Sequence, residues 1–141
     1  IRSNRIATST NELIGALTLA RSEAMRSPGG AVVCASSDGA NCTGSWNQGW
    51  IVWMDLNGNR NLDGNDRVIR ASQARNRITV TEKNAVNRIE FDHRGRVSLS
   101  PTPSEPLALT VAPTTCPTNA KLRRTITLTV AGQITSTQVD C

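Results

Sequence analysis

Residues 11–26 have the sequence NELIGALTLARSEAMR and decide the fold, because they form an amphipathic helix. Together with one earlier isoleucine, their apolar residues recur at spacings of three, four and seven, which places them on one side of a helix. This apolar stripe comprises Ile6, Leu13, Ile14, Leu17, Ala20 and Ala24. The helix begins near the first residue, without a clear capping signal, and stops at Ser27-Pro28-Gly29-Gly30. We therefore expect residues 1–27 to form the downstream half of a longer helix.

The rest of the chain has the pattern of short β-strands. Apolar and polar residues alternate in segments that are separated by turn-forming residues. The predicted strands cover residues 31–36, 49–55, 67–71, 77–81, 87–92, 96–100, 107–111, 124–130 and 133–139. We expect 49–55 to be covered on both faces, 87–92 and 96–100 to form a hairpin, and 100–106 to be a loop. The 141 residues suit one α+β domain, in which the helix packs on antiparallel sheet formed by residues 28–141.

Four cysteines point to structural disulfides. Cys34 and Cys42 lie eight residues apart across a polar segment, and Cys116 and Cys141 bracket the last part of the chain. Of the three possible pairings, we expect Cys34–Cys42 and Cys116–Cys141. The competing zinc site lacks support, because there is no Cys-x-x-Cys pair and His93 is the only histidine. Disulfides predict an oxidising, extracytoplasmic location.

Several motifs together resemble a known family. They are Leu13-x-x-x-Leu17-x-x-Ala20-Arg21-Ser22-Glu23-Ala24, Val33-Cys34-x-Ser36, Asp38-Gly39, Trp46, Gly49-Trp50-Ile51-Val52-Trp53-x-Asp55, Asn57-Gly58 and Gly95-Arg96-Val97. On these residues the chain resembles the GspH/FimT family, the pseudopilins and minor pilins of type II secretion systems and type IV pili. Within the family it most resembles the FimU and FimT minor pilins. The match is dense over residues 1–70 and sparse afterwards.

The resemblance implies a pilin-like fold and a role in fibre assembly. The expected function is that of a minor pilin, which joins other minor pilins in a priming complex at the fibre tip and starts polymerisation of the major pilin. The alternative is a type II secretion pseudopilin, which would assemble with other subunits in the same way. The family also implies a membrane-spanning segment ahead of Ile1, and hence a periplasmic domain of a single-pass inner-membrane protein. Contacts with neighbouring subunits are expected from the sheet loops and from Arg2, Arg5, Glu12 and Glu23.

The net charge of +5 comes mainly from arginine and raises the alternative of DNA binding. Arginine binds phosphate through paired hydrogen bonds. The candidate DNA-binding residues are Arg75, Arg77, Arg88, Arg94, Arg96, Arg123 and Arg124. Some FimT-type relatives bind DNA in natural transformation, where a Gly-Arg-x-Arg motif is implicated. Here Gly95-Arg96-Val97-Ser98 matches only its first half, and aromatic residues for base stacking are scarce. The other interpretation is a solvated strand face or a contact to an acidic partner.

Residues 55–66, DLNGNRNLDGND, resemble a calcium-binding loop. Oxygen-bearing side chains recur at alternate positions, as in an EF-hand. The candidate ligands are Asp55, Asn57, Asn59, Asn61, Asp63 and Asp66. Against this, Arg60 stands where the sharp turn needs glycine, and Asp66 replaces the bidentate glutamate. The alternative is an ordinary hairpin loop whose side chains bond their own backbone, so that the protein needs no cofactor.

No recognised catalytic motif is present, and we do not expect an enzyme or a small-molecule substrate. The sequence lacks a nucleophile elbow, a phosphate-binding glycine loop and a His-Glu-x-x-His motif. Three tryptophans are clustered, of which we expect Trp50 or Trp53 in the core and Trp46 at the surface. His93 lies beside a predicted turn, and we expect it to be exposed.

Overall fold

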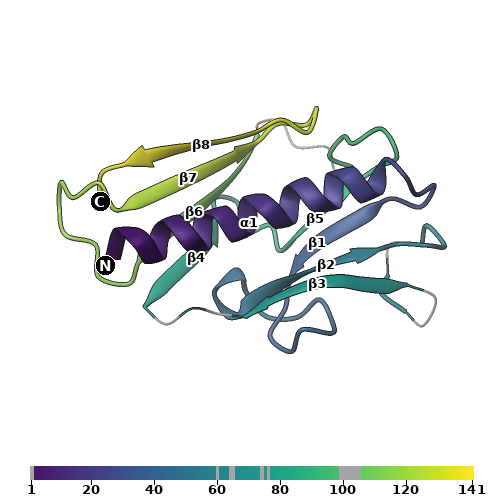
Figure 1. Cartoon of the computed structure of the whole chain (residues 1–141), viewed down its shortest axis with the longest axis horizontal. Helices are drawn as coiled ribbons and strands as arrows, with labels where there is room; N and C mark the ends of the chain where they lie inside the picture. The colour runs from purple at the N-terminus through teal and green to yellow at the C-terminus, as the bar shows by residue number, and fades with distance from the viewer. Residues whose placement is uncertain (1, 60, 64–65, 74, 76, 99–105) are drawn as a thin grey trace.

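The computed structural model describes residues 2–59, 61–63, 66–73, 75, 77–98 and 106–141. Over these residues the chain forms one long helix, a short 3-10 helix and eight strands (Figure 1). In chain order they are α1 (Arg2–Ala24), β1 (Ala31–Ala35), η1 (Trp46–Gln48), β2 (Gly49–Met54), β3 (Arg67–Gln73), β4 (Ile78–Glu82), β5 (Arg88–Phe91), β6 (Leu107–Pro113), β7 (Arg123–Leu128) and β8 (Ile134–Val139).

The described strands form two antiparallel sheets, with α1 lying across both (Figure 1). The first sheet has the order β3-β2-β1-β5, and the second has the order β4-β6-β7-β8. Side chains from α1 and from both sheets share one apolar core. The α+β class and the antiparallel sheets predicted from the sequence are therefore confirmed.

The apolar stripe of α1 faces this core. Leu13 and Leu17 are fully buried, and Ile6, Ala20 and Ala24 are at most 2% exposed. The helix ends at Ala24, and the backbone N–H of Ser27 donates to the carbonyl of Ala24 before Pro28 stops continuation. Among the described residues, no helix is long and apolar enough to cross a membrane.

The two central strands of the first sheet, β1 and β2, are buried on both faces, as predicted for residues 49–55, whereas edge strand β3 is largely exposed. One face contributes to the shared core. On the other face, Val32, Cys34, Ile51 and Trp53 form a second apolar cluster, which is covered by Cys42 and Leu62. The loop between β1 and β2 therefore folds back over the sheet instead of extending into solvent.

Three sequence-based predictions need correction. The predicted hairpin of 87–92 and 96–100 is present in a shorter form: Phe91 and Val97 form an antiparallel bridge, flanked by hydrogen bonds from the Ser98 N–H to the Glu90 carbonyl and from the Asp92 N–H to the Arg96 carbonyl. The outward N–H of Val97 donates to the carbonyl of Val130 in the β7–β8 turn, and residues 99 and 100 lie outside the described residues. Trp46 is only 3% exposed and not at the surface. Its indole N–H donates to the carbonyl of Val86 at 2.8 Å, so a distant loop provides both its cover and its polar partner. Arg77 does not belong to β4, because its φ of 65° is left-handed.

The remaining strand predictions agree with the structure to within a few residues, and the turn at Ala131-Gly132 is present. His93 is exposed, as expected. Most of the predicted loop at 100–106 lies outside the described residues.

Candidate functional site

The side of α1 opposite the core carries a continuous stripe of small residues. Their spacing alternates between four and three, so they lie along one line of the helix. We call this the outer stripe; its members are Asn4, Thr8, Asn11, Gly15, Thr18 and Ser22. All are exposed except Gly15, which is half-buried. The hydroxyl of Thr18 donates to the carbonyl of Ile14 at 2.8 Å, so this side chain satisfies its own polar group and leaves a methyl group outward.

Small side chains allow the backbone of another helix to approach closely. The outer stripe is therefore suited to helix–helix contact. The sequence predicts subunit contacts at the sheet loops and at four helix residues, Arg2, Arg5, Glu12 and Glu23. Of these, Arg5, Glu12 and Glu23 lie on the flank of the helix, and the side chain of Arg2 lies outside the described part of the structure. Glu12 forms an ion pair with Arg75 of the same chain, and Glu23 is half-buried beside Arg26. Because Glu12 is engaged within the chain, the outer stripe is the better candidate for contacts.

Arg21 joins the end of α1 to turns from both sheets. Its Nε donates to the carbonyl of Gly95 at 3.0 Å, in the turn that follows β5. Gly95 has a φ of 76°, and an added Cβ would lie 2.8 Å from the sulfur of Met25. Gly132, in the β7–β8 turn, approaches the same carbonyl so closely that its Cβ would lie 2.2 Å away. The glycine of the Gly95-Arg96 motif is therefore explained by packing around Arg21.

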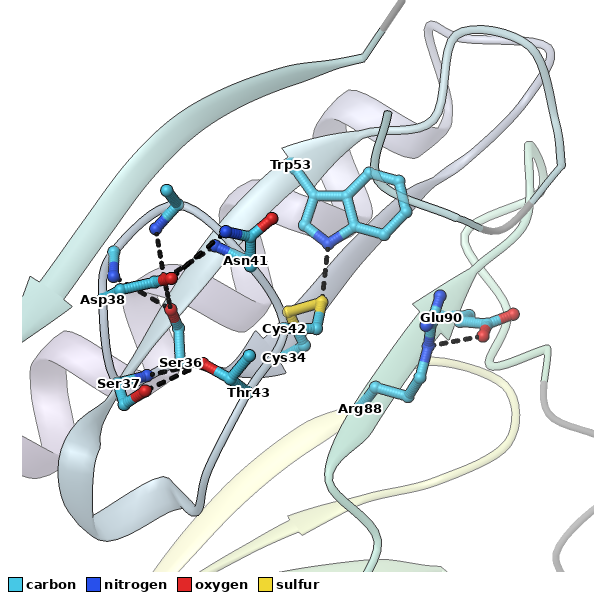
Figure 2. Close-up of a disulfide and its surroundings, with 12 residues drawn as sticks. Cys34, Ser36, Ser37, Asp38, Asn41, Cys42, Thr43, Trp53, Arg88 and Glu90 are labelled. Atoms are coloured by element: carbon cyan, nitrogen blue, oxygen red, sulfur yellow. Dashed lines mark hydrogen bonds and ion pairs between the residues drawn. A yellow bond between two sulfur atoms is a disulfide. The ribbon is translucent and has the colours of Figure 1, made fainter. Parts of the chain in front are cut away.

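The loop between β1 and β2 is closed by the Cys34–Cys42 disulfide, with a Cα–Cα distance of 5.5 Å (Figure 2). The indole N–H of Trp53 points to Cys42 Sγ at 3.3 Å. Arg88 lies over the same indole ring, with its guanidinium carbon 5.7 Å from the ring centroid, and its Nε is 2.9 Å from Glu90 Oε2. The disulfide, the tryptophan and the ion pair thus form one structural unit on the outer face of the first sheet.

Asp38 organises the turn inside this disulfide-bonded loop (Figure 2). Its Oδ1 accepts backbone N–H groups from Ala40 at 2.9 Å and from Asn41 at 2.8 Å. The side chains of Asn41 and Ser36 also donate to this carboxylate. These backbone bonds, followed by the side-chain bonds, hold the pKa of Asp38 well below its ordinary value of 3.8.

This arrangement predicts a specific pH dependence. Because the folded-state pKa is lowered, the stabilising contribution of Asp38 is fully present above pH 3.8 and is lost as the pH falls toward the folded-state pKa. In an NMR titration, we expect the Asp38 carboxyl group to remain ionised at about pH 3, where an ordinary aspartate is mostly protonated. The stability difference between the wild type and Asp38→Asn should shrink on further acidification. A carboxyl signal that titrates at the ordinary value would contradict the turn geometry.

The second predicted disulfide is also present and ties down the end of the chain. Cys116 and Cys141 are bonded, with their Cα atoms 5.4 Å apart. The N–H of Cys141 donates to the carbonyl of Ala120, and Arg123 Nη2 donates to the carbonyl of Asp140 at 2.7 Å. The loop before β7 and the last residues after β8 are therefore held together.

The candidate DNA-binding arginines do not form one patch. Arg77 lies beside Arg5 near the start of α1, and Arg123 and Arg124 begin β7 at the same end of the second sheet. Arg94 and Arg96 lie in the turn held by Arg21, near the other end of the helix. Arg5 and Arg21 are sixteen residues apart, so these two groups are separated by roughly 24 Å along α1.

Two more candidates already have partners inside the chain, since Arg75 pairs with Glu12 and Arg88 with Glu90. The grouping by sequence position thus differs from the grouping in space. DNA binding by these residues stays a prediction.

The acidic loop after β2 bonds largely to itself. Asp66 accepts the backbone N–H groups of Leu56 and Asp63, and Asp63 accepts the side-chain amides of Asn57 and Asn59. The side chains of Asn57 and Asn59 accept N–H groups from Asn59 and Asn61.

Asp55, at the start of this loop, is buried and only 1% exposed. Within the described part of the chain, which omits residues 60, 64 and 65, no three carboxylate, histidine or cysteine side chains gather as a metal site. Calcium binding stays a prediction.

Comparison with known proteins places this architecture in a family. The sequence profile of the family described as type II transport protein GspH matches residues 9–132, which is most of the chain. The chain belongs to the GspH family. This membership confirms the resemblance seen in the sequence motifs. No curated protein sequence matches significantly.

Two solved structures share the GspH-family fold described here. Both are crystal structures of the type IV minor pilin FimU from Pseudomonas aeruginosa PAO1. The first, in space group P21, has a TM-score of 0.69 at 22% identity and covers 94% of this chain and 87% of that chain. The second, in space group P65, has a TM-score of 0.66 at 20% identity and covers 93% and 91%, respectively. At this identity, the likeness establishes the pilin-like fold.

Two features of the site escaped the sequence analysis. The outer stripe carries a usable signal, because Asn, Thr, Gly and Ser recur at helical spacing opposite the apolar stripe. Arg21 enters the sequence analysis only as part of the family motif, although it holds two turns together. Its role depends on contacts across 74 residues of sequence, and no local pattern reports them.

Proposed function

We propose that this chain is the periplasmic domain of a minor pilin of a type IV pilus, anchored by a preceding membrane segment and incorporated into the fibre through α1. It would join other minor pilins in a priming complex and help to start polymerisation of the major pilin. Membership of the GspH family and the fold shared with FimU support this assignment. The observation that carries it is the outer stripe, since one side of α1 is packed into the domain while the other presents small residues along the helix.

The outer stripe also supports a mechanism of assembly. A fibre held together by helices needs a rigid domain that fixes each helix in place and leaves one side free. The buried stripe fixes α1 to both sheets, and Arg21 anchors its end. Small residues on the free side allow neighbouring helices to pack closely, with the Arg70 side chain, whose Nη1 lies 3.4 Å from the Cβ position of Gly15, moved aside.

Asn11→Arg is expected to abolish pilus assembly while leaving the domain folded. Arginine is a better helix former than asparagine, but its bulk and charge obstruct a closely packed helix interface. The measurement is the amount of surface pili in the source organism, after deletion of the gene and complementation with the full-length variant. Asn87→Arg adds the same side chain at an exposed position outside the helix and should restore piliation.

The outcome also separates the alternatives. Loss of a secreted enzyme without loss of pili in the deletion strain would assign the chain to a type II secretion system. Normal piliation with Asn11→Arg would contradict assembly through the outer stripe.

A further inference from the structure

The edges of the two sheets differ in how well they are protected from pairing with another strand. An unprotected edge presents unpaired backbone N–H and C=O groups, and proteins usually block such edges with charge, bulges or covering segments. Edge strand β3 carries Arg67 and Arg70 and pairs with β2 through a register shift. Edge strand β5 is short, and the N–H of Ser98 already donates to the carbonyl of Glu90 on its outer side.

Edge strand β4 is blocked by a side chain. In the β4–β6 ladder, the N–H of Lys83 donates to the carbonyl of Ala108, and the N–H of Thr114 donates to the carbonyl of Arg77. Because bonded and unbonded pairs alternate along the ladder, the N–H of Val80 points away from β6. The side-chain oxygen of Asn47, in η1, accepts this N–H. The opposite edge strand of the same sheet is β8, and among the described residues no side chain accepts its outward N–H groups.

Strand β8 has the sequence ITSTQV, without charge or proline. The N–H of Thr129 donates to the carbonyl of Gln133, which sets the alternation of the β7–β8 ladder. By this alternation Ile134, Ser136 and Gln138 present their backbone groups away from β7. Figure 1 shows β8 along the border of the molecule, with its outer side uncovered by the labelled elements.

A hollow of about 420 Å³ lies between the beginning of β8 and the end of α1. Met25, directly after α1, lines it and is 49% exposed, although it is a large apolar residue. Ile134 lines it from β8 and packs partly against the core. A strand added beside β8 would place an apolar side chain next to Ile134 and above this hollow.

The other end of β8 is basic. Arg124 lies opposite Gln138 and Arg123 opposite Val139 in the β7–β8 ladder, and Lys121 is exposed just before them. Asp140 is the acidic residue nearby. This end therefore favours a partner with carboxylates. A second copy of the chain is disfavoured, because it has the same uncharged β8, the same basic end and a net charge of +5.

We propose that β8 is a docking edge for an extended segment of a different fibre subunit, which adds to the second sheet as an antiparallel strand. The incoming strand carries acidic residues opposite the Val139 end and an apolar residue opposite Ile134. The backbone supplies the hydrogen bonds of the ladder, and the hollow and the arginines supply selectivity. This inference rests on the proposed function, because the strand that is added to β8 comes from another fibre subunit.

The test uses the 141-residue chain and a blocked, fluorescent peptide, Glu-Glu-Thr-Val-Thr-Leu. Ordered from its N-terminus, this peptide places the two glutamates at the Val139 end and the leucine beside Ile134. We expect saturable binding by fluorescence anisotropy, with amide NMR shifts concentrated on β8. The peptide Lys-Lys-Thr-Val-Thr-Leu should bind more weakly, and the difference should shrink with added salt.

Ser136→Pro is expected to weaken binding about tenfold or more, because it removes an outward N–H and inserts a ring at the edge. Ser136→Val keeps the N–H and should bind like the wild type. Met25→Lys lies outside β8, so it tests the hollow without changing the strand, and it should also reduce affinity. Melting curves and the β7–β8 ladder signals of each variant establish that it is folded.

Three results would overturn the proposal: no binding at millimolar peptide, shifts located away from β8, or equal binding to the wild type and folded Ser136→Pro. Sedimentation of the chain alone tests self-pairing, and a dimer that is abolished by Ser136→Pro would assign the edge to a second copy instead. The peptide assay measures β8, whereas the piliation assay with Asn11→Arg measures α1. Failure of one is therefore distinguishable from failure of the other.

Discussion

Leu17→Ala is expected to lower the free energy of unfolding by roughly 3–5 kcal/mol. Leu17 is fully buried in the middle of the apolar stripe, where α1 contacts the core shared by both sheets. Alanine leaves a cavity there, and the surrounding strands cannot collapse to fill it, because the helix is anchored at its end through Arg21. Chemical denaturation of the isolated chain measures the change.

Leu56→Ala is the matched control for this cavity. Leu56 is 51% exposed, so the same substitution should alter the free energy of unfolding by no more than about 0.5 kcal/mol. Equal losses for the two variants would mean that α1 does not hold the two sheets together. A change in the denaturant slope for Leu17→Ala, without a change in the unfolding free energy, would instead indicate an altered unfolded state.

Removing the Cys116–Cys141 disulfide is expected to cost about 3.5 kcal/mol from loop-closure entropy alone. The bond joins residues that are 25 apart in sequence and holds the end of the chain next to the loop before β7. With both cysteines replaced by alanine, the last residues after β8 should also fray. Denaturation measures the loss, and hydrogen exchange at β8 measures the fraying. Unchanged stability and unchanged exchange would show that the hydrogen bonds of Arg123 and Cys141 suffice.

The Cys34–Cys42 disulfide provides the comparison. Its residues are 8 apart, so the same loop-closure argument predicts a smaller loss of about 2.5 kcal/mol. Cys34 is fully buried beside Trp53, however, so its replacement also disturbs packing. Any loss beyond the loop-closure value measures this packing contribution.

Much of the fold could be predicted because its signals are local. The apolar spacing of α1 identifies the residues that are buried, including Ile6 and Leu17, and the alternating strands identify β2 as covered on both faces. Cysteine spacing and position favoured the pairing that the structure contains. The helix and strand signals depend on residues close in sequence, and the cysteine pairing is a choice among only three combinations.

The errors have a common physical origin. Trp46 is predicted at the surface, yet it is buried and its indole N–H donates to the carbonyl of Val86, forty positions away. The second strand of the predicted hairpin is reduced to a bridge at Val97, whose outward N–H donates to the carbonyl of Val130 in the β7–β8 turn. A short periodic pattern indicates that one face of an element is covered, but it does not indicate which residues cover that face.

The sequence by itself determined the helix and its buried side, the approximate positions of the strands, the disulfides and the family. The tertiary structure alone decided the strand order, the division of the arginines into groups at two ends of α1, the role of Arg21, and the exposure of β8 as an edge. The physical reason is that side-chain periodicity encodes which side of an element avoids water. The neighbours on that side, and the backbone groups left unpaired at an edge, depend on contacts between distant segments.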